Sequence, residues 1–142
     1  MLLDKMRFVF FLMFFLYSSL AFGYELCIHT VEGVHYFKTD IADTPELQEK
    51  GLMYKKYIPT NYAMTFLFEK PKIIRMWMKN TFIPLDMIFF DENGIITHLK
   101  ENAIPHDLTH ISSRIPAKGV IEINAGLIQQ KKIKIGDKIT LK

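Results

Sequence analysis

The feature that most limits what this sequence can fold into is a series of short apolar runs, rich in β-branched and aromatic residues and separated by turn-forming residues. Runs this short predict strands, because an amphipathic helix needs a longer periodic stretch. The candidate strands are residues 26–30, 34–39, 64–68, 73–82, 85–90, 95–99, 120–123 and 138–141. They predict a mainly β single domain of about seven strands, either a β-sandwich or a partly open barrel.

Turn residues join several of these runs. Glu32-Gly33 and residues 91–94 (Asp-Glu-Asn-Gly) each predict a β-hairpin, since Asn and Gly tolerate the positive φ angles of tight turns. The stretch 100–118 is different, because it contains prolines and shows no clear period. It predicts a long loop, and long loops in compact domains are often functional.

Two short helices are expected beside the strands. The first covers residues 43–51, where Pro45 suits the first turn and Gly51 closes the helix. The second covers residues 126–131, with Asn124 as its predicted cap.

The N-terminus predicts a secretory signal peptide over residues 1–23. A basic segment precedes an unbroken apolar run at 8–16, and small residues follow, which is the order of regions in a signal peptide. The apolar run is too short to cross a bilayer comfortably, which argues against an uncleaved anchor. We expect cleavage after Gly23, or alternatively after Ala21. Residues 24–142 would then be exported to the periplasm or the exterior as one globular β domain.

Charge and cysteine content narrow the functional classes. The chain has 18 Lys and Arg against 15 Asp and Glu, a formal net charge of +3. Nucleic-acid and anionic-membrane binding need clustered basic side chains, so no nucleic-acid partner is expected. The chain is expected to meet the membrane only through the signal peptide, before cleavage. The single Cys27 has no intrachain disulfide partner, and we expect it to pack as a small apolar residue in a strand.

The run 73–82 contains the densest group of candidate binding residues. Its apolar residues at positions 74, 76 and 78 share one face of a strand, whereas Arg75, Trp77 and Lys79 share the other. The first face predicts core. The second suits a sugar-like or anionic ligand stacked on the indole. Alternatively, Trp77 covers an edge of the core, with the aliphatic stems of the two cations lying along it.

Asp86 and Glu122 are carboxylates within otherwise apolar strands. A carboxyl group in such surroundings either pairs with a partner or has a raised pKa that could serve acid–base chemistry. One interpretation is a buried polar cluster in which Asp86 caps backbone groups. The other is a binding pocket, whose hypothetical members are Trp77, Lys79, Asn80, Asp86, Glu122 and Asn124.

Two metal hypotheses have weaker support. His106 and His110 would share one face of a helical turn, but the sequence supplies no third ligand for zinc. Met76 and Met78 are soft donors of the type that selects Cu(I), although methionines more commonly fill a core. We therefore expect no cofactor.

Longer motifs follow one another in an order that resembles a known family. They are GLMY at 51–54, the run 64–68, WMKNT at 77–81, IPLD at 83–86, SS at 112–113, EINAG at 122–126 and GD at 136–137. From about Phe37 onward, the sequence resembles the exported domain of unknown function 192. Ala63 and Met76 depart from the Gly and the aromatic residue usual in that family. The resemblance implies a compact, mostly β domain without an established activity, and it carries over no catalytic residue.

Three functional classes remain open. The expected one is a non-catalytic binding or interaction module of the cell envelope, for a small polar ligand or a protein partner, because the sequence contains no recognisable nucleophile motif. The second is a hydrolase or transferase with Asp86 and Glu122 as acid and base. The third is a periplasmic carrier of copper or zinc. On balance the sequence favours a protein that is not an enzyme.

Overall fold

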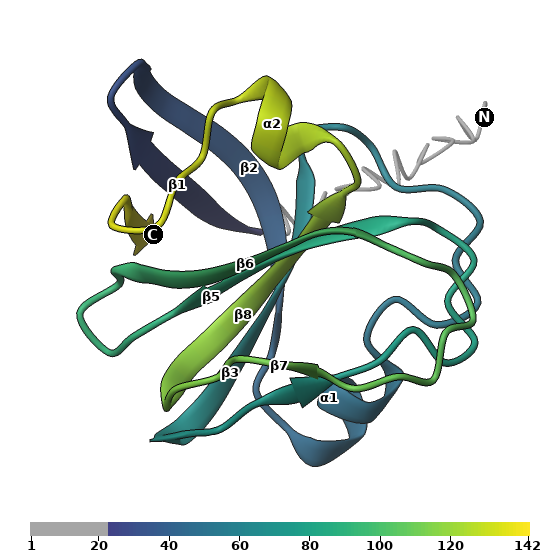
Figure 1. The fold of residues 1–142 in the computed structure, drawn as a ribbon. Helices are drawn as coiled ribbons and strands as arrows, with labels where there is room; N and C mark the ends of the chain where they lie inside the picture. Colours follow the sequence, from purple (N-terminus) through teal and green to yellow (C-terminus); the bar gives the residue numbers. More distant parts are fainter. Residues whose placement is uncertain (1–22) are drawn as a thin grey trace, which may run out of the picture.

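The computed structural model describes residues 23–142, which form a strongly curved, mainly β single domain (Figure 1). The strands are β1 Tyr24–Thr30, β2 Gly33–Ala42, β3 Tyr62–Lys72, β4 Arg75–Met76, β5 Leu85–Phe90, β6 Ile96–Ala103, β7 Ile111–Ser112, β8 Ala117–Asn124 and β9 Lys138–Leu141. The helices are α1 Pro45–Lys50 and α2 Leu127–Gln130. The predicted fold class, with its two short helices, is confirmed.

One sheet has the strand order β6-β5-β8-β3-β2-β1-β9. Its neighbouring strands are antiparallel, except β2 and β3, which are parallel and connected through α1. The sheet curls until β9 meets the β5–β6 hairpin. There, the Ile139 N–H donates to the Gly94 carbonyl oxygen and the Gly136 N–H to the Ile96 carbonyl oxygen, both at 2.8 Å. The sheet is therefore a partly open barrel, the second of the two predicted architectures.

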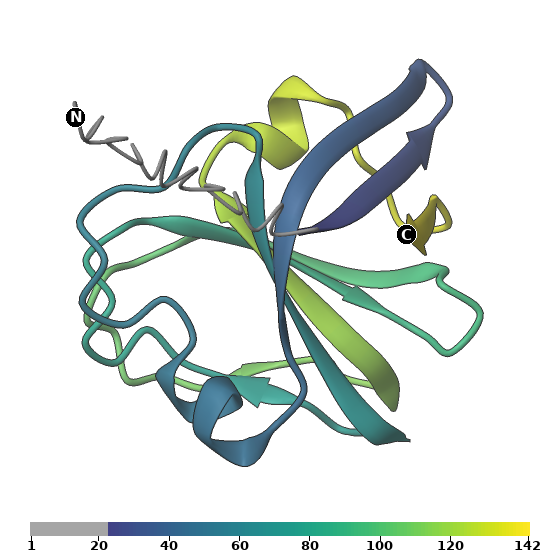
Figure 2. The ribbon, with the colours of Figure 1, turned by 180° about the vertical axis from the view of Figure 1, so that it is seen from behind.

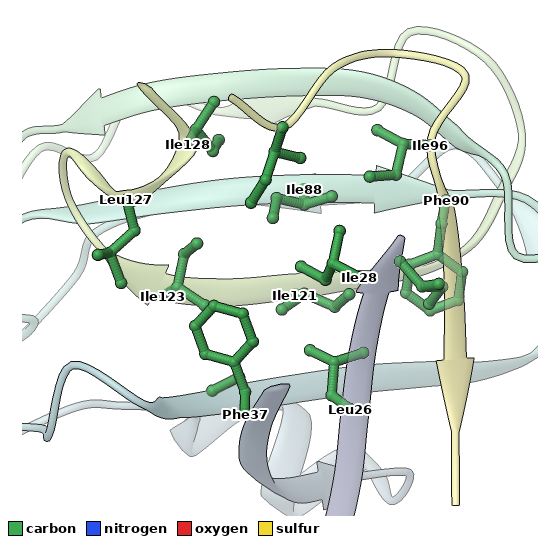
Figure 3. Packing of buried hydrophobic residues seen from close by; sticks show 13 residues of the cluster. Leu26, Ile28, Phe37, Ile88, Phe90, Ile96, Ile121, Ile123, Leu127 and Ile128 are labelled. Atoms are coloured by element: carbon green, nitrogen blue, oxygen red, sulfur yellow. The ribbon is translucent and has the colours of Figure 1, made fainter. Parts of the chain in front are cut away.

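The two faces of this sheet bury separate apolar cores. The first core, which includes Ile88 and Ile123, lies inside the curl against α2 and β9 (Figure 3). The second core, which includes Met87 and Val120, lies on the other face, on the side of α1 and of the ribbon formed by β4 and β7. Figure 2 shows α1 and α2 on opposite sides of the sheet. Because side chains alternate along a strand, successive residues of β5 and β8 face different cores.

Both predicted hairpins and the first helix are confirmed. β1 pairs with β2, and β5 pairs with β6. The Thr44 hydroxyl oxygen caps α1 by accepting a hydrogen bond from the Leu47 N–H at 3.3 Å. Pro45 begins the helix, and Gly51 follows it with a φ of 44°.

The second helix, α2, forms at the predicted place, but Asn124 does not cap it. The Asn124 amide donates to the carbonyl oxygens of Ile58 and Pro59, at 3.0 and 3.3 Å, and so ties that loop to the sheet. The Ile128 N–H in the helix donates to Asp86 Oδ2 at 2.9 Å. A free backbone N–H in the first turn of α2 is thus hydrogen-bonded by a carboxyl group of β5, which is far away in the sequence.

The predicted strand 73–82 is wrong in length, because only Arg75–Met76 pairs as a strand. The chain turns directly after Met78, where the Thr81 N–H donates to the Met78 carbonyl oxygen at 3.2 Å. Asn80 adopts a φ of 49° in this turn, a conformation that a strand excludes.

The predicted loop 100–118 is also shorter than expected. β6 continues to Ala103, and β8 begins at Ala117. The first four and the last two residues of the predicted loop therefore belong to strands of the main sheet. β7, which pairs with β4, divides the remainder into residues 104–110 and 113–116.

The predicted signal peptide falls on residues outside the described part of the chain, apart from its last residue, Gly23. Within residues 23–142, no helix is long and apolar enough to cross a membrane. Cys27 is a buried free cysteine in β1, as expected.

Candidate functional site

Glu122 lies in the middle of β8 with its side chain on the second-core face. Its cross-strand neighbours are Met64 of β3 and Met87 of β5. The side chain is only 4% exposed. Removing a carboxyl group from water disfavours its charged form, and burial raises the pKa of Glu122 to about 8. At pH 7 the group is therefore mainly protonated and able to donate a hydrogen bond.

The Glu122 carboxyl lines a small cavity of about 70 Å³. Within residues 23–142, no basic side chain forms an ion pair with this carboxyl group. Every side-chain oxygen in this range that is completely buried has a hydrogen-bond partner. The cavity adjoins a larger hollow of about 310 Å³, with which it shares Gln48, Phe66 and Trp77. We call the two together the Glu122 groove. Its lining residues are Gln48, Glu49, Lys50, Gly51, Leu52, Met53, Phe66, Phe68, Arg75, Met76, Trp77, Lys79, Thr81, His110 and Glu122.

One wall of the groove is α1 with the residues that follow it. The Gln48 amide donates to the Leu67 carbonyl oxygen at 2.8 Å and fixes the helix to β3. Gly51 then lets the chain pass close to the sheet, because a Cβ at this position would lie 3.0 Å from Phe66 Cζ. Its positive φ independently favours glycine. The C-terminal end of α1 is thereby held against β3.

The other wall is the segment that contains Trp77. The predicted alternation holds here although the strand is short: Ile74 and Met78 are buried, and Arg75, Trp77 and Lys79 are exposed. Trp77 is 38% exposed, and the Lys79 ammonium lies 5.0 Å from the centre of its ring. A half-exposed indole with a cation beside it provides a stacking surface for a polar ligand.

The groove thus combines three kinds of interaction. Trp77 offers an aromatic surface, Arg75 and Lys79 offer positive charge, and the protonated Glu122 offers a hydrogen bond at the inner end. Chemically, such an arrangement can orient a polar molecule against apolar walls.

The hypothetical pocket of six residues is wrong as a single site. The structure brings Trp77, Lys79 and Glu122 together in the groove. Asp86 is fully buried on the opposite face of the sheet, because its partner on β8 is Ile123, the neighbour of Glu122. Its Oδ1 accepts from the Asn102 N–H and its Oδ2 from the Ile128 N–H, both at 2.9 Å. Asp86 therefore has the alternative, structural role of binding backbone groups.

The two asparagines of that pocket also lie outside the groove. The Asn80 amide donates to the Tyr54 hydroxyl oxygen at 2.9 Å, and Asn124 binds the loop carbonyls described above. Because Asp86 and Glu122 face different cores, they cannot act on one substrate as an acid–base pair. The enzyme hypothesis based on those two residues is therefore wrong.

The metal hypotheses find no support in the arrangement of side chains. His106 has a φ of 64° and lies outside any helix, so it does not share a helical face with His110. The His106 ring packs against Phe82 at 5.0 Å between ring centres. Met76 and Met78 both pack in the second core. Within residues 23–142, no group of three or more His, Cys, Asp or Glu side chains is arranged to hold a metal ion.

Sequence reasoning missed the contribution of α1 to the site. Gln48, Glu49 and Thr81 line the groove, and none of them was a candidate. The helix itself was predictable from its capping residues, but its position across the groove from the segment 75–81 depends on long-range packing. No local pattern in the sequence reports such a position.

Comparison with known families agrees with the resemblance noted in the sequence. Residues 27–141 match the model of the family DUF192, described as "Uncharacterized ACR". This match covers most of the chain, and the protein therefore belongs to the DUF192 family. No curated protein matches the chain.

Two solved structures illustrate what the fold is similar to. One is a protein from Sinorhizobium meliloti 1021, provisionally described as a transcription regulator; it is 36% identical, with a TM-score of 0.80, and the match covers 82% of this chain and 92% of that one. The other is a protein of unknown function from Novosphingobium aromaticivorans DSM 12444, 35% identical, with a TM-score of 0.80 and coverage of 82% and 83%.

Proposed function

We propose that this protein is a binding module that holds a small polar ligand in the Glu122 groove. The observation that carries the proposal is a buried carboxyl group that opens onto a cavity and has no ion-pair partner within residues 23–142. Leaving such a group without a partner is costly, so structural carboxyls are normally satisfied by the protein, as Asp86 is. A ligand would supply the partner that Glu122 lacks.

The size and chemistry of the groove limit the ligand. The inner cavity, at about 70 Å³, accommodates a single polar group such as a hydroxyl or a carbonyl. The rest of the ligand would lie in the outer hollow of about 310 Å³, against the Trp77 ring. A sugar-like molecule, with an apolar face for the indole and an oxygen for the protonated Glu122, has these properties.

The experiment is an NMR titration of the protein, expressed from the full-length sequence, with sugars, peptidoglycan fragments and nucleotides. A ligand of the groove shifts the Trp77 indole signal saturably. Glu122→Met removes the donor at similar volume, and we expect it to weaken binding by about tenfold or more. Glu122→Gln keeps a donor in the same place and should retain the affinity.

The pH dependence separates this mechanism from simple loss of shape. A ligand that accepts a hydrogen bond from the neutral carboxyl binds the wild type less well as the pH rises through about 8. The Glu122→Gln variant does not titrate, and its affinity should stay constant over the same range. Equal binding by the wild type and Glu122→Met would contradict the proposal.

We also propose that the chain is exported and processed. The support is the order of basic, apolar and small residues before Tyr24. Expression with a functional secretion system should yield a protein that begins at Tyr24 by intact mass, with Phe22 as the first residue in the alternative case. An uncleaved chain of full mass would refute processing.

A further inference from the structure

A second cavity adjoins the Trp77 segment at Met78 and is lined by residues before, within and after β7. It has a volume of about 330 Å³ and extends from Met78 to β6. Four nitrogen-bearing side chains line it from three parts of the chain: His98 and Lys100 from β6, His110 before β7, and Arg114 after it. His110 also lines the outer part of the Glu122 groove, so the two sites are neighbours.

The cationic side chains of this cavity have no protein anion bound to them. The one ion pair within residues 23–142 joins Lys132 and Glu32, so neither Lys100 nor Arg114 has a carboxylate within 4.0 Å in that range. Asp107 also lines the cavity, but its Oδ1 accepts from the Thr109 N–H at 2.8 Å. Hydrogen bonds from Thr109, and to a lesser extent the positive charge of Lys100, hold the pKa of Asp107 below its ordinary value. Arg114 has no carboxylate bound to it within residues 23–142, so its positive charge is not compensated by an ion pair.

The backbone at Arg114 is unusual for a residue with a side chain. Its φ is 68°, in the left-handed region that glycine adopts without cost and that is unfavourable for most other residues. The Arg114 N–H donates to Ser112 Oγ at 3.0 Å, which holds this turn. The turn places the arginine at the cavity wall, and strain of this type is commonly retained where a side chain has a task.

We propose that this cavity binds an oxyanion, the phosphate or carboxylate group of a small molecule, through Arg114, Lys100 and His98. The planar guanidinium of arginine matches two oxygens of such a group at once, and the lysine ammonium adds charge. This site is independent of the Glu122 groove, whose inner end offers a neutral carboxyl instead.

His98 provides a reporter for the bound anion. It is half-buried and stacks on Phe89 at 5.7 Å between ring centres. Burial, and to a lesser extent the charge of Arg114, hold the pKa of His98 below its ordinary value. The other titratable groups that line the cavity are Lys100, Asp107 and His110. An anion placed between Arg114 and His98 offsets the arginine charge, so the His98 pKa should rise when the anion binds.

The test is an NMR titration of the protein with inorganic phosphate and, separately, with acetate. Saturable shifts at Arg114, Ser112 and Thr109, with a rise in the imidazole pKa of His98, are expected for at least one anion. The stronger of the two identifies the source as a phosphate or a carboxylate compound. Shifts that grow linearly without saturation for both anions would overturn the proposal.

Variants make the test specific. Arg114→Gln should weaken binding by about tenfold or more, and Arg114→Lys, which keeps the charge but loses the planar fork, should weaken it less. Lys70→Gln removes a charge from an exposed position outside the cavity and should change nothing. If Arg114→Gln proves unstable in a thermal melt, Lys100→Gln serves as the second variant. Unchanged affinity in a folded Arg114→Gln or Lys100→Gln would overturn the proposal.

Glu122→Met separates this proposal from the proposed function. It removes the donor of the groove and should leave phosphate or acetate binding unchanged, so either site can fail without the other.

Discussion

Two carboxyl groups of this domain, Asp86 and Glu122, are buried in different ways. Asp86 receives a backbone N–H on each oxygen, whereas Glu122 is held by apolar neighbours and opens onto a cavity. The first arrangement stabilises the fold. In the second arrangement, the buried carboxyl group is stabilised by taking up a proton, or by a hydrogen bond to a ligand.

Glu122 should make stability depend on pH. Its pKa is raised from 4.5 to about 8 on folding, so the folded state holds this proton more tightly, and the wild type loses stability as the pH rises through that window. Glu122→Gln does not ionise and should gain stability relative to the wild type from pH 5 to pH 8, by at most about 5 kcal/mol. Urea unfolding at several pH values measures the difference. If the difference in unfolding free energy between Glu122→Gln and the wild type stayed constant with pH, the pKa of Glu122 would not be raised on folding.

Asp86 should be sensitive to a change of one atom. Asp86→Asn replaces one acceptor oxygen with a donor, which then faces a backbone N–H, and we expect a loss of about 2–4 kcal/mol in urea unfolding. Asp91→Asn is the matched control, because a single oxygen of Asp91 accepts both of its hydrogen bonds, from the N–H groups of Asn93 and Ile95 at 2.9 Å. An equal effect of the two substitutions would contradict this role of Asp86.

The sequence identified both carboxyls as exceptional, but it could not separate their roles. Each interrupts an apolar run, and which face each occupies depends on how β5 and β8 pair. The pairing of Met87 with Glu122 sets Asp86 opposite Ile123, and this places the two carboxyls on different faces. Register of this kind is a long-range property, so local patterns do not contain it.

The short helix α1 forms a wall of the Glu122 groove and contributes no buried residue to either core. None of its residues is buried, and it is held by its cap, by the Gln48 amide and by the close passage of Gly51. Its capping residues made it predictable. The strand 73–82 was predicted too long because the alternation of apolar residues continues beyond the paired residues. In this segment the Thr81 N–H donates to the Met78 carbonyl oxygen within a turn, and the Met78 N–H donates to the Asp107 carbonyl oxygen rather than to a neighbouring strand.

Gly51 should be the most sensitive residue of this wall. Gly51→Ala puts a Cβ at 3.0 Å from the Phe66 ring and forces a side chain into positive φ. We expect a loss of about 2 kcal/mol or more, accompanied by weaker ligand binding in the groove. Gly126→Ala is the control, because it also has a positive φ but no heavy atom within 4 Å of the added carbon. Similar unfolding midpoints for both variants would argue against the tight passage.

In the assembled domain, a few backbone hydrogen bonds between residues 136–139 and the β5–β6 hairpin link the two edges of the partly open barrel. A Cβ at Gly94 would lie 2.7 Å from the Ile139 carbonyl oxygen, so only glycine allows the two ends to approach. Gly94→Ala should therefore separate them and cost about 2 kcal/mol or more. Faster amide exchange at Ile96 and Ile139 is the expected signature. Gly33→Ala, with a positive φ, nothing within 4 Å and a place in the distant β1–β2 turn, should leave that exchange slow.

The strand order also has a consequence for when the domain can fold. Up to residue 116, the chain contains two separate pieces of the main sheet, β1-β2-β3 and β5-β6, which share no paired strand. They are joined only when β8 inserts between β3 and β5. A chain that is made or translocated from its N-terminus therefore completes its central sheet only when the last fifth of its length is available. Under the proposed export, in which the chain would cross a membrane unfolded, this order of assembly would postpone the stable fold until passage is nearly finished.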